Sequence, residues 1–215
     1  NAYTFMKNAM NRGVSGSFIT ESSDRVEKAV SKLFNSNRQI AYFSNKADAI
    51  KYALLFSKES TIVWKPWSTF QQDISSVKSI VFSPTFPWTD SIYIVAIQKD
   101  LYSENIELDD FAKNKMKIPF PLQAGIARSI YNLIEALSER KETDWFIYDS
   151  ILTKYWTRKG PYLFPKVPNE DYDKFVLHCL SLGIIINPNY DSPSIVPFRA
   201  DKGVFTKLKN SPFNY

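Results

Sequence analysis

Residues 12–17 have the composition of an anion-binding loop. They read RGVSGS, so one guanidinium, two hydroxyl groups and two glycines follow one another closely. Glycine lets the backbone turn its N–H groups outward, and such amides bind anions together with hydroxyl groups and arginine. The segment lacks the Lys-Ser/Thr ending of a P-loop, so it does not predict a nucleotide site. The candidate anion-binding residues are Arg12, Ser15 and Ser17, with an ordinary loop as the alternative.

Tryptophan follows two of the expected strands and is interleaved with proline. Residues 64–67 read WKPW and residues 84–88 read PTFPW. Exposed rings in such segments can stack on bases or pack against proline-rich chains. The same rings can instead cover the end of a sheet inside the core. Trp64, Trp67 and Trp88 are therefore candidate ligand-binding residues, and both interpretations remain open at this point.

Basic residues gather in the C-terminal half, where two helices and a following hairpin would make a winged helix. The helices would run from Asp144 to Tyr155 and from Tyr172 to Leu182. Lysine and arginine at such positions neutralise phosphates of nucleic acid. The second helix carries few side chains that can read base edges, so a solvated surface explains the charge equally well. The candidate phosphate contacts are Lys154, Arg158, Lys159 and Lys166.

Cysteine and histidine each occur once, as the neighbours Cys179 and His178. One cysteine cannot form an intramolecular disulfide, which argues against a secreted, disulfide-built domain. The pair supplies no zinc ligand set, and consecutive helical residues point in different directions. No apolar run approaches the roughly 20 residues of a membrane span. We therefore expect no metal site, a structural role for both residues and a cytoplasmic protein.

The composition and periodicity predict an α/β fold. Of 215 residues, 44% are hydrophobic and 23% are charged, which suffices for one large core or two small ones. Apolar residues at helical spacing alternate with β-branched and aromatic runs up to residue 97. This alternation predicts a three-layer-like α/β portion over residues 1–118. The expected helices are 1–10, 22–34 and 46–56, and the expected strands are 39–43, 61–64, 77–82 and 91–97.

A long helix is expected to open the C-terminal part, residues 119–215. Prolines 119 and 121 precede it, and proline is favoured in a first helical turn. We expect an α+β lobe after this helix, with Gly183 in a C-cap position. The expected elements are helices 122–137, 144–155, 171–182 and 204–209, and strands 161–167, 184–186 and 194–199.

Several stretches of this part resemble one family in their order. Residues 160–167 read GPYLFPKV, a helix ends in LSLG at residue 183, and residues 184–188 and 195–199 read IIINP and IVPFR. This pattern resembles the small domain of fold-type I, pyridoxal-phosphate-dependent aminotransferases. The helix beginning PLQA at residue 121 resembles the long helix before that domain, and residues 42–49 resemble the strand, turn and helix that open the large domain. The resemblance implies a two-domain fold, and the family is commonly dimeric.

The resemblance also implies roles for two residues. Arg199 falls on the position of the arginine that binds a substrate carboxylate through two parallel hydrogen bonds. Lys99 follows the strand ending at Ile97 and would form the aldimine with pyridoxal phosphate, which requires a lowered amine pKa. Nothing beside Lys99 predicts a lowered pKa, and Asp100 would oppose it. A surface ion pair for Arg199 and a solvated strand end for Lys99 are the alternatives.

The sequence departs from the family where the cofactor would bind. The turn at residues 44–46 has no glycine for a phosphate cradle, and no expected strand carries a convincing aspartate for the pyridinium. Residues 62–97 are too few for the family's full large-domain sheet. We therefore expect an aminotransferase-like protein that lacks a working pyridoxal-phosphate site, binds no cofactor, and acts as a binding or assembly component with a protein partner or as a homodimer. The alternatives are a winged-helix-like nucleic-acid binder and a minimal pyridoxal-phosphate enzyme using Lys99.

Overall fold

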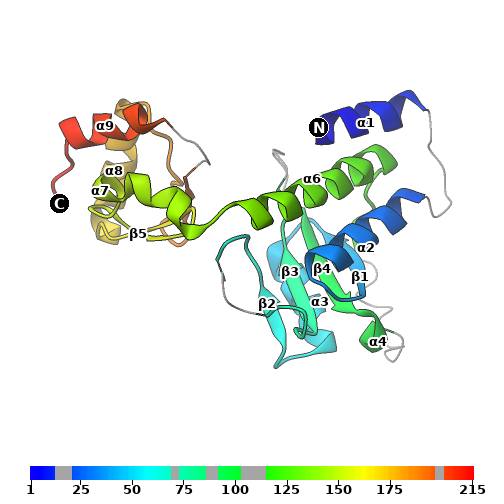
Figure 1. Ribbon diagram of the computed structural model, residues 1–215. Helices are drawn as coiled ribbons and strands as arrows, with labels where there is room; N and C mark the ends of the chain where they lie inside the picture. The colour runs from blue at the N-terminus through cyan, green and yellow to red at the C-terminus, as the bar shows by residue number, and fades with distance from the viewer. Residues whose placement is uncertain (13–20, 69–72, 86–91, 103–114, 197–200) are drawn as a thin grey trace. The chain divides into compact units, whose positions relative to one another are not determined.

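The computed structural model describes residues 1–12, 21–68, 73–85, 92–102, 115–196 and 201–215. The chain forms two compact units. The first unit comprises residues 1–65 and 71–139, and the second comprises residues 66–70 and 140–215. Both contain helices and strands, so the chain is a mixed α/β protein, as the sequence predicts (Figure 1).

A four-stranded sheet forms the centre of the first unit, in the order β1-β4-β3-β2. Strand β4 is antiparallel to both of its neighbours, and β2 is parallel to β3. It follows that β1, β2 and β3 all end at the edge where β4 begins. We call this edge the carboxyl edge and the opposite one the amino edge. The strands are β1 (Arg38–Phe43), β2 (Thr61–Val63), β3 (Ser79–Phe82) and β4 (Tyr93–Gln98).

Helices cover both faces of this sheet, because its strands are apolar on both sides. Helix α3 (Lys46–Phe56) packs Tyr52 and Phe56 against one face. Helix α2 (Glu21–Leu33) lies on the other face, where the Phe34 ring just after it meets Phe82 edge-on at 5.2 Å between centroids. Figure 1 shows α2 and α3 on opposite sides of the sheet. The expected three layers are therefore present.

Helix α6 (Phe120–Glu139) belongs with the first unit. It packs against α2 and against α1 (Ala2–Asn11) through an apolar face that includes Ile126 and Ile130. The sequence-based division at residue 118 had placed this helix with the C-terminal lobe. Its buried face instead completes the helical layer of the N-terminal unit, and the second unit begins at Arg140. The short helix α4 (Lys99–Tyr102) follows β4.

The second unit is a small α+β lobe. Its three-stranded antiparallel sheet has the order β5-β6-β7. Aromatic rings dominate its core, with Trp145, Tyr155, Trp156 and Phe175 each at most 1% exposed. The elements are η1 (Glu142–Tyr148), α7 (Asp149–Leu152), β5 (Trp156–Lys159), β6 (Tyr162–Pro165), α8 (Asn169–Ser181), β7 (Ser194–Ile195) and α9 (Lys202–Asn210).

Three expectations for this lobe are wrong in detail. Residues 144–155 form a 3-10 helix and a short α-helix instead of one helix. Residues 156–159 form a strand that pairs with β6 across a turn at Gly160, so the hairpin lies before α8 and not after it. Residues 184–186 form no strand, because the Ile184 amide donates to Cys179 O and closes the end of α8. Gly183 has a φ of 75° at this helix end, as its expected C-cap position requires.

Candidate functional site

The carboxyl edge of the first-unit sheet is where a ligand is expected in an open α/β fold, since loops after parallel strands meet there. The turn after β1 leads directly into α3. The Asn45 side chain accepts a hydrogen bond from the Ala47 amide at 2.7 Å and caps the helix. An internal side chain therefore already binds one of the amides that a phosphate would use.

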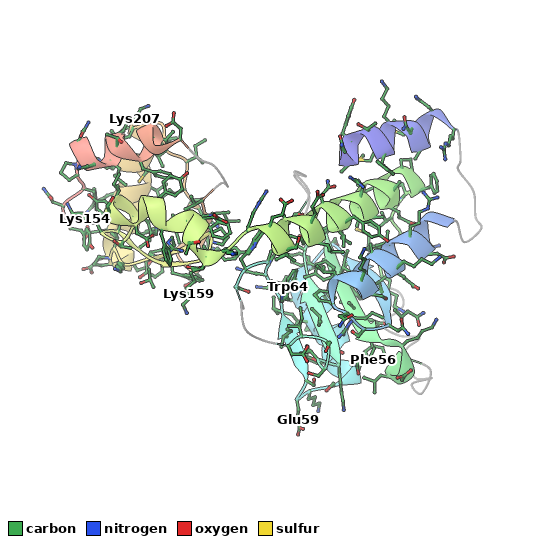
Figure 2. All side chains as sticks on the ribbon, viewed as in Figure 1. Phe56, Glu59, Trp64, Lys154, Lys159 and Lys207 are labelled. Carbon is green, nitrogen blue, oxygen red and sulfur yellow. The ribbon has the colours of Figure 1, made fainter. Side chains whose placement is uncertain are left out.

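Trp64 follows β2 at this edge and belongs to the core. Its ring is 6% exposed and meets Phe34 and Phe82 edge-on, with centroid distances of 5.2 and 6.1 Å. Figure 2 labels it beside the sheet of the first unit. Trp64 therefore lies in the core at the end of the sheet and does not present its ring at the surface.

Trp67 belongs to the second unit and packs edge-on against Trp145, at 5.5 Å between centroids. The Arg140 guanidinium lies over the same indole at 5.5 Å from its centroid. Trp64 therefore belongs to the core of the first unit, and Trp67 packs against the core of the second. Trp88 lies outside the described residues.

Lys65 is a residue at the carboxyl edge that the sequence pattern did not single out. Burial lowers the pKa of its amine, and the positive charge of Lys46 at the start of α3 lowers that pKa further. A desolvated lysine beside a second cation is the environment that favours a neutral, nucleophilic amine. In the sequence, Lys65 could have been recognised by its position directly after a strand, between Trp64 and Pro66.

Lys99 lies at the amino edge, away from Trp64. Gln98 pairs with Arg38 at the beginning of β1, and Ile97 pairs with Ser79 at the beginning of β3. The Lys99 side chain is exposed and lines an open pocket of about 590 Å³. Burial raises the pKa of Glu27 in this pocket, and the charge of Lys99 partly opposes that rise.

Arg38, which lines the same pocket, has a structural role. Its side chain donates to Ser36 Oγ at 2.8 Å, to Val77 O at 2.7 Å and to Ala96 O at 3.3 Å. Three further backbone carbonyls, of residues 74, 75 and 78, accept from it. Burial lowers the pKa of this guanidinium to about 10. These hydrogen bonds hold the segment before β3 against the sheet. The Arg38 guanidinium is therefore used within the fold and is not a ligand-binding group.

The three cofactor-binding features implied by the resemblance are therefore not assembled among the described residues. Lys65 and Lys99 lie at opposite edges of the sheet. The four strands of the first unit contain no aspartate, and the turn at residues 44–46 contains no glycine. Arg199 lies outside the described residues.

The four candidate phosphate contacts of the second unit differ in their surroundings. Arg158 forms ion pairs with Glu142 and Asp149, and its side chain is 5% exposed. Lys166 donates to Thr153 O at 2.7 Å. Lys154 and Lys159 are exposed on this unit (Figure 2). Arg158 is thus paired with two carboxylates of the same unit. The β5–β6 hairpin lies before α8, whereas a winged helix would require it after that helix.

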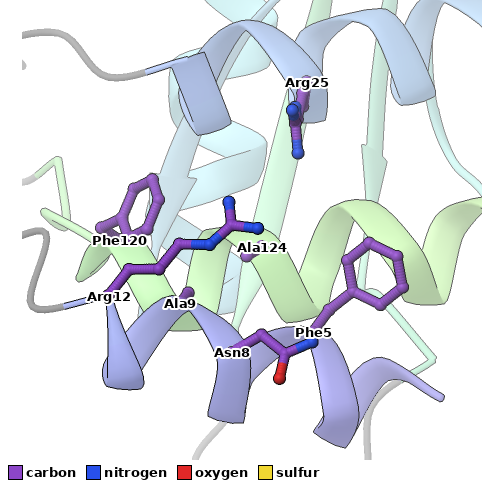
Figure 3. A pocket seen from close by; sticks show the side chains of 7 residues that line it. All are labelled: Phe5, Asn8, Ala9, Arg12, Arg25, Phe120 and Ala124. Carbon is purple, nitrogen blue, oxygen red and sulfur yellow. The ribbon is translucent and has the colours of Figure 1, made fainter.

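The anion-binding candidates are only partly described. Arg12 caps the C-terminal end of α1 and lines a pocket between α1, α2 and α6 (Figure 3). Ser15 and Ser17 lie outside the described residues. In the part of the chain that the structure describes, no group of three His, Cys, Asp or Glu side chains is placed to hold a metal ion. No helix of that part is long and apolar enough to cross a membrane.

Comparison with known sequences gives one short match. No family model matches the chain. A stretch of 58 residues is 34% identical to an uncharacterized protein of Treponema pallidum (strain Nichols). This match covers 27% of the chain and 19% of that protein, so the chain spans about a fifth of the relative's length.

Comparison with solved structures gives much broader matches. Ornithine δ-aminotransferase of Plasmodium falciparum aligns over 97% of this chain and 82% of its own, with a TM-score of 0.65 and 11% identity. A serine palmitoyltransferase of S. paucimobilis with a bound PLP-myriocin aldimine aligns over 98% and 83%, with a TM-score of 0.66 and 9% identity. The 8-amino-7-oxononanoate synthase of Francisella tularensis aligns over 98% and 91%, with a TM-score of 0.67 and 10% identity. The chain therefore has the fold of pyridoxal-phosphate-dependent aminotransferases and related enzymes.

Proposed function

We propose that this chain is a non-catalytic member of the aminotransferase-like fold that acts as a binding or assembly component. The observation that carries this proposal is the position of Lys99, exposed at the amino edge of the sheet and beside Glu27. A buried Trp64 and a capped α3 stand at the edge where a ligand would otherwise bind. Among the described residues, these features support a chain that retains the fold without using it for catalysis.

The surface of the second unit supports the assembly part of the proposal. Ile185 and Ile195 are 88% and 65% exposed, and both line a largely apolar pocket of about 430 Å³. Clustered exposed apolar side chains around a pocket mark an interaction surface more often than an ordinary protein surface. We assign this surface to a second copy of the chain, in keeping with the dimers common in enzymes that the sequence resembles.

Light scattering after size-exclusion chromatography tests this assignment. The chain is expected at twice its monomer mass, and Ile185→Glu is expected to shift it to the monomer. Leu55→Glu is the matched control, because Leu55 is also an exposed apolar residue but lies on α3 of the first unit. A monomeric wild-type chain at all concentrations would exclude the homodimer.

Absorption spectroscopy tests the non-catalytic part. Pyridoxal phosphate is added to the purified chain, which is then desalted. We expect no aldimine band to remain. A retained band that disappears in Lys99→Ala would instead support the minimal enzyme.

A further inference from the structure

Residues 211–215 follow α9 and pack against the core of the second unit through Phe213. They read SPFNY, and Phe213 is half-buried whereas the other four residues are exposed. The five residues belong to no helix or strand. The segment is therefore held by its rings and by a few directed hydrogen bonds, and not by a ladder of backbone pairs.

Three side chains of the unit receive this segment. Tyr155 precedes β5, and Phe175 and His178 lie on α8, three residues apart and so on one face of the helix. The Tyr155 ring stacks on the Phe175 ring, with 5.1 Å between centroids and 29° between planes. We call Tyr155, Phe175 and His178 the docking surface. Two parts of the chain thus contribute three aromatic rings to it.

Two members of the docking surface bind the backbone of the segment. The Phe213 amide donates to the Tyr155 hydroxyl oxygen at 3.0 Å. His178 Nε2 donates to Ser211 O at 2.9 Å. Hydrogen bonds to the main chain do not depend on the side chains that a peptide carries. An extended segment of another chain can therefore make the same two bonds.

The side chains of the segment supply specificity. The Phe213 ring lies 5.2 Å from the Phe175 ring and 5.5 Å from the His178 ring, measured between centroids. The Tyr215 ring stacks beside Phe213 at 6.2 Å, and its hydroxyl donates to Lys154 O at 3.2 Å. Two aromatic residues, two positions apart, are thus both recognised, the first by ring contacts and the second by a carbonyl.

Few contacts hold the segment closed. Tyr215 is 53% exposed although its ring takes part in the docking. Segments with so few buried contacts open while the rest of a domain stays folded. We infer that the docking surface is a peptide-binding site, closed here by residues 211–215, whose partner is an extended segment of another protein with phenylalanine and tyrosine two residues apart. This inference does not depend on the homodimer proposed through Ile185 and Ile195.

Fluorescence anisotropy with a labelled peptide of residues 210–215 tests this site on the full chain. The wild-type chain is expected not to bind the peptide, because its own segment competes at an effective concentration of roughly millimolar or more. Phe213→Ala removes the main ring of that segment and opens the docking surface, so this variant is expected to bind. A peptide with alanine in place of phenylalanine is the ligand control and is expected not to bind.

Two hydroxyl variants, each made in the Phe213→Ala chain, separate the docking surface from general adhesion to exposed rings. Tyr155→Phe removes only the acceptor of the backbone hydrogen bond, so it should weaken peptide binding roughly fivefold. Tyr190→Phe is the matched control and should bind normally, because the Tyr190 ring packs on Tyr172 instead. Equal weakening by the two variants would overturn the inference. So would a folded Phe213→Ala chain that fails to bind, or a wild-type chain that binds equally well.

Hydrogen exchange on the wild-type chain keeps the inference testable if Phe213→Ala does not fold. The Phe213 amide should exchange more slowly than in the free peptide but faster than amides in the middle of α8, because the segment opens by itself. Exchange as slow as that of α8 would mean that the segment leaves only when the unit unfolds, which overturns the inference. Conversion of a wild-type dimer to a monomer by Phe213→Ala would also overturn it, since the segment would then be exchanged between copies.

Discussion

The guanidinium of Arg158 donates to the carboxylate of Glu142, with 2.6 Å between Nη1 and Oε1. Asp149 accepts from the other side of the same guanidinium, and the Phe146 ring lies 5.0 Å from its Cζ. Gly160 O also accepts from it, at 2.9 Å. One buried arginine thus joins η1, α7 and the β5–β6 turn.

We expect Asp149→Asn to lower the free energy of unfolding of the second unit by roughly 2 kcal/mol, because it leaves a buried cation with one fewer charged acceptor. Urea denaturation followed by tryptophan fluorescence measures this loss. Lys174→Gln is the control, since the Lys174–Asp171 pair is exposed to solvent and should contribute little to stability. Equal losses in the free energy of unfolding for the two substitutions would mean that the ion pairs of Arg158 do not stabilise this unit more than an exposed pair does.

Arg38 gives a similar prediction for the first unit. Its side chain is 2% exposed and donates to five backbone carbonyls and one hydroxyl group. Arg38→Met should lower the free energy of unfolding by roughly 3 kcal/mol, because buried carbonyls lose their donors. Lys51→Met, an exposed charge on α3, serves as the control and should change little. Hydrogen exchange should also rise at residues 79–82, and unchanged protection there would contradict the role assigned to Arg38.

Gly183 is expected to resist substitution because of its backbone and not because of crowding. Its φ is 75°, and of the atoms in the described part of the chain a Cβ added there would meet only Lys207 Nζ, at an ordinary 3.7 Å. Gly183→Ala should therefore cost about 1 kcal/mol, and Gly183→Asn less, since asparagine tolerates this conformation better. Thermal melts of the two variants compare them. The opposite order would show that contacts and not φ determine the preference.

Cys179 should react with a thiol reagent only after unfolding. It is fully buried, and burial raises the pKa of its thiol from 9.0 to about 12. Between pH 9 and 12 the unfolded chain loses this proton while the folded chain keeps it, so the free energy of unfolding should fall as pH rises above about 9. Cys179→Ala should show a smaller fall in urea titrations at pH 8 and 10. Rapid labelling of the folded chain at pH 8 would contradict the burial.

Local signals predicted much of the fold. Asn45 before α3, Pro119 and Pro121 at the start of α6, and Gly183 after α8 mark helix ends at or near where the structure has them. The apolar runs of β1 to β4 indicate strands because their side chains are buried on both faces of a sheet. Such signals arise within a few residues of the element that they specify.

The predictions that are wrong depend on interactions between residues that are far apart in the sequence. Arg158 looked like a phosphate contact because its partners Glu142 and Asp149 are 16 and 9 residues away and occupy other elements. Ile184 to Ile186 looked like a strand, but the first amide closes α8. The edge of the sheet on which Lys99 lies depends on strand order and direction, which a list of strands does not contain.

Reductive trapping shows whether any lysine of this chain binds pyridoxal phosphate. The chain is incubated with one equivalent of pyridoxal phosphate, treated with borohydride, and digested for mass spectrometry. We predict that the trapped label is substoichiometric and spread over several exposed lysines, with no single site dominating. Stoichiometric labelling of Lys99, or of Lys65 with its lowered amine pKa, would contradict the claim that this fold carries no working cofactor site.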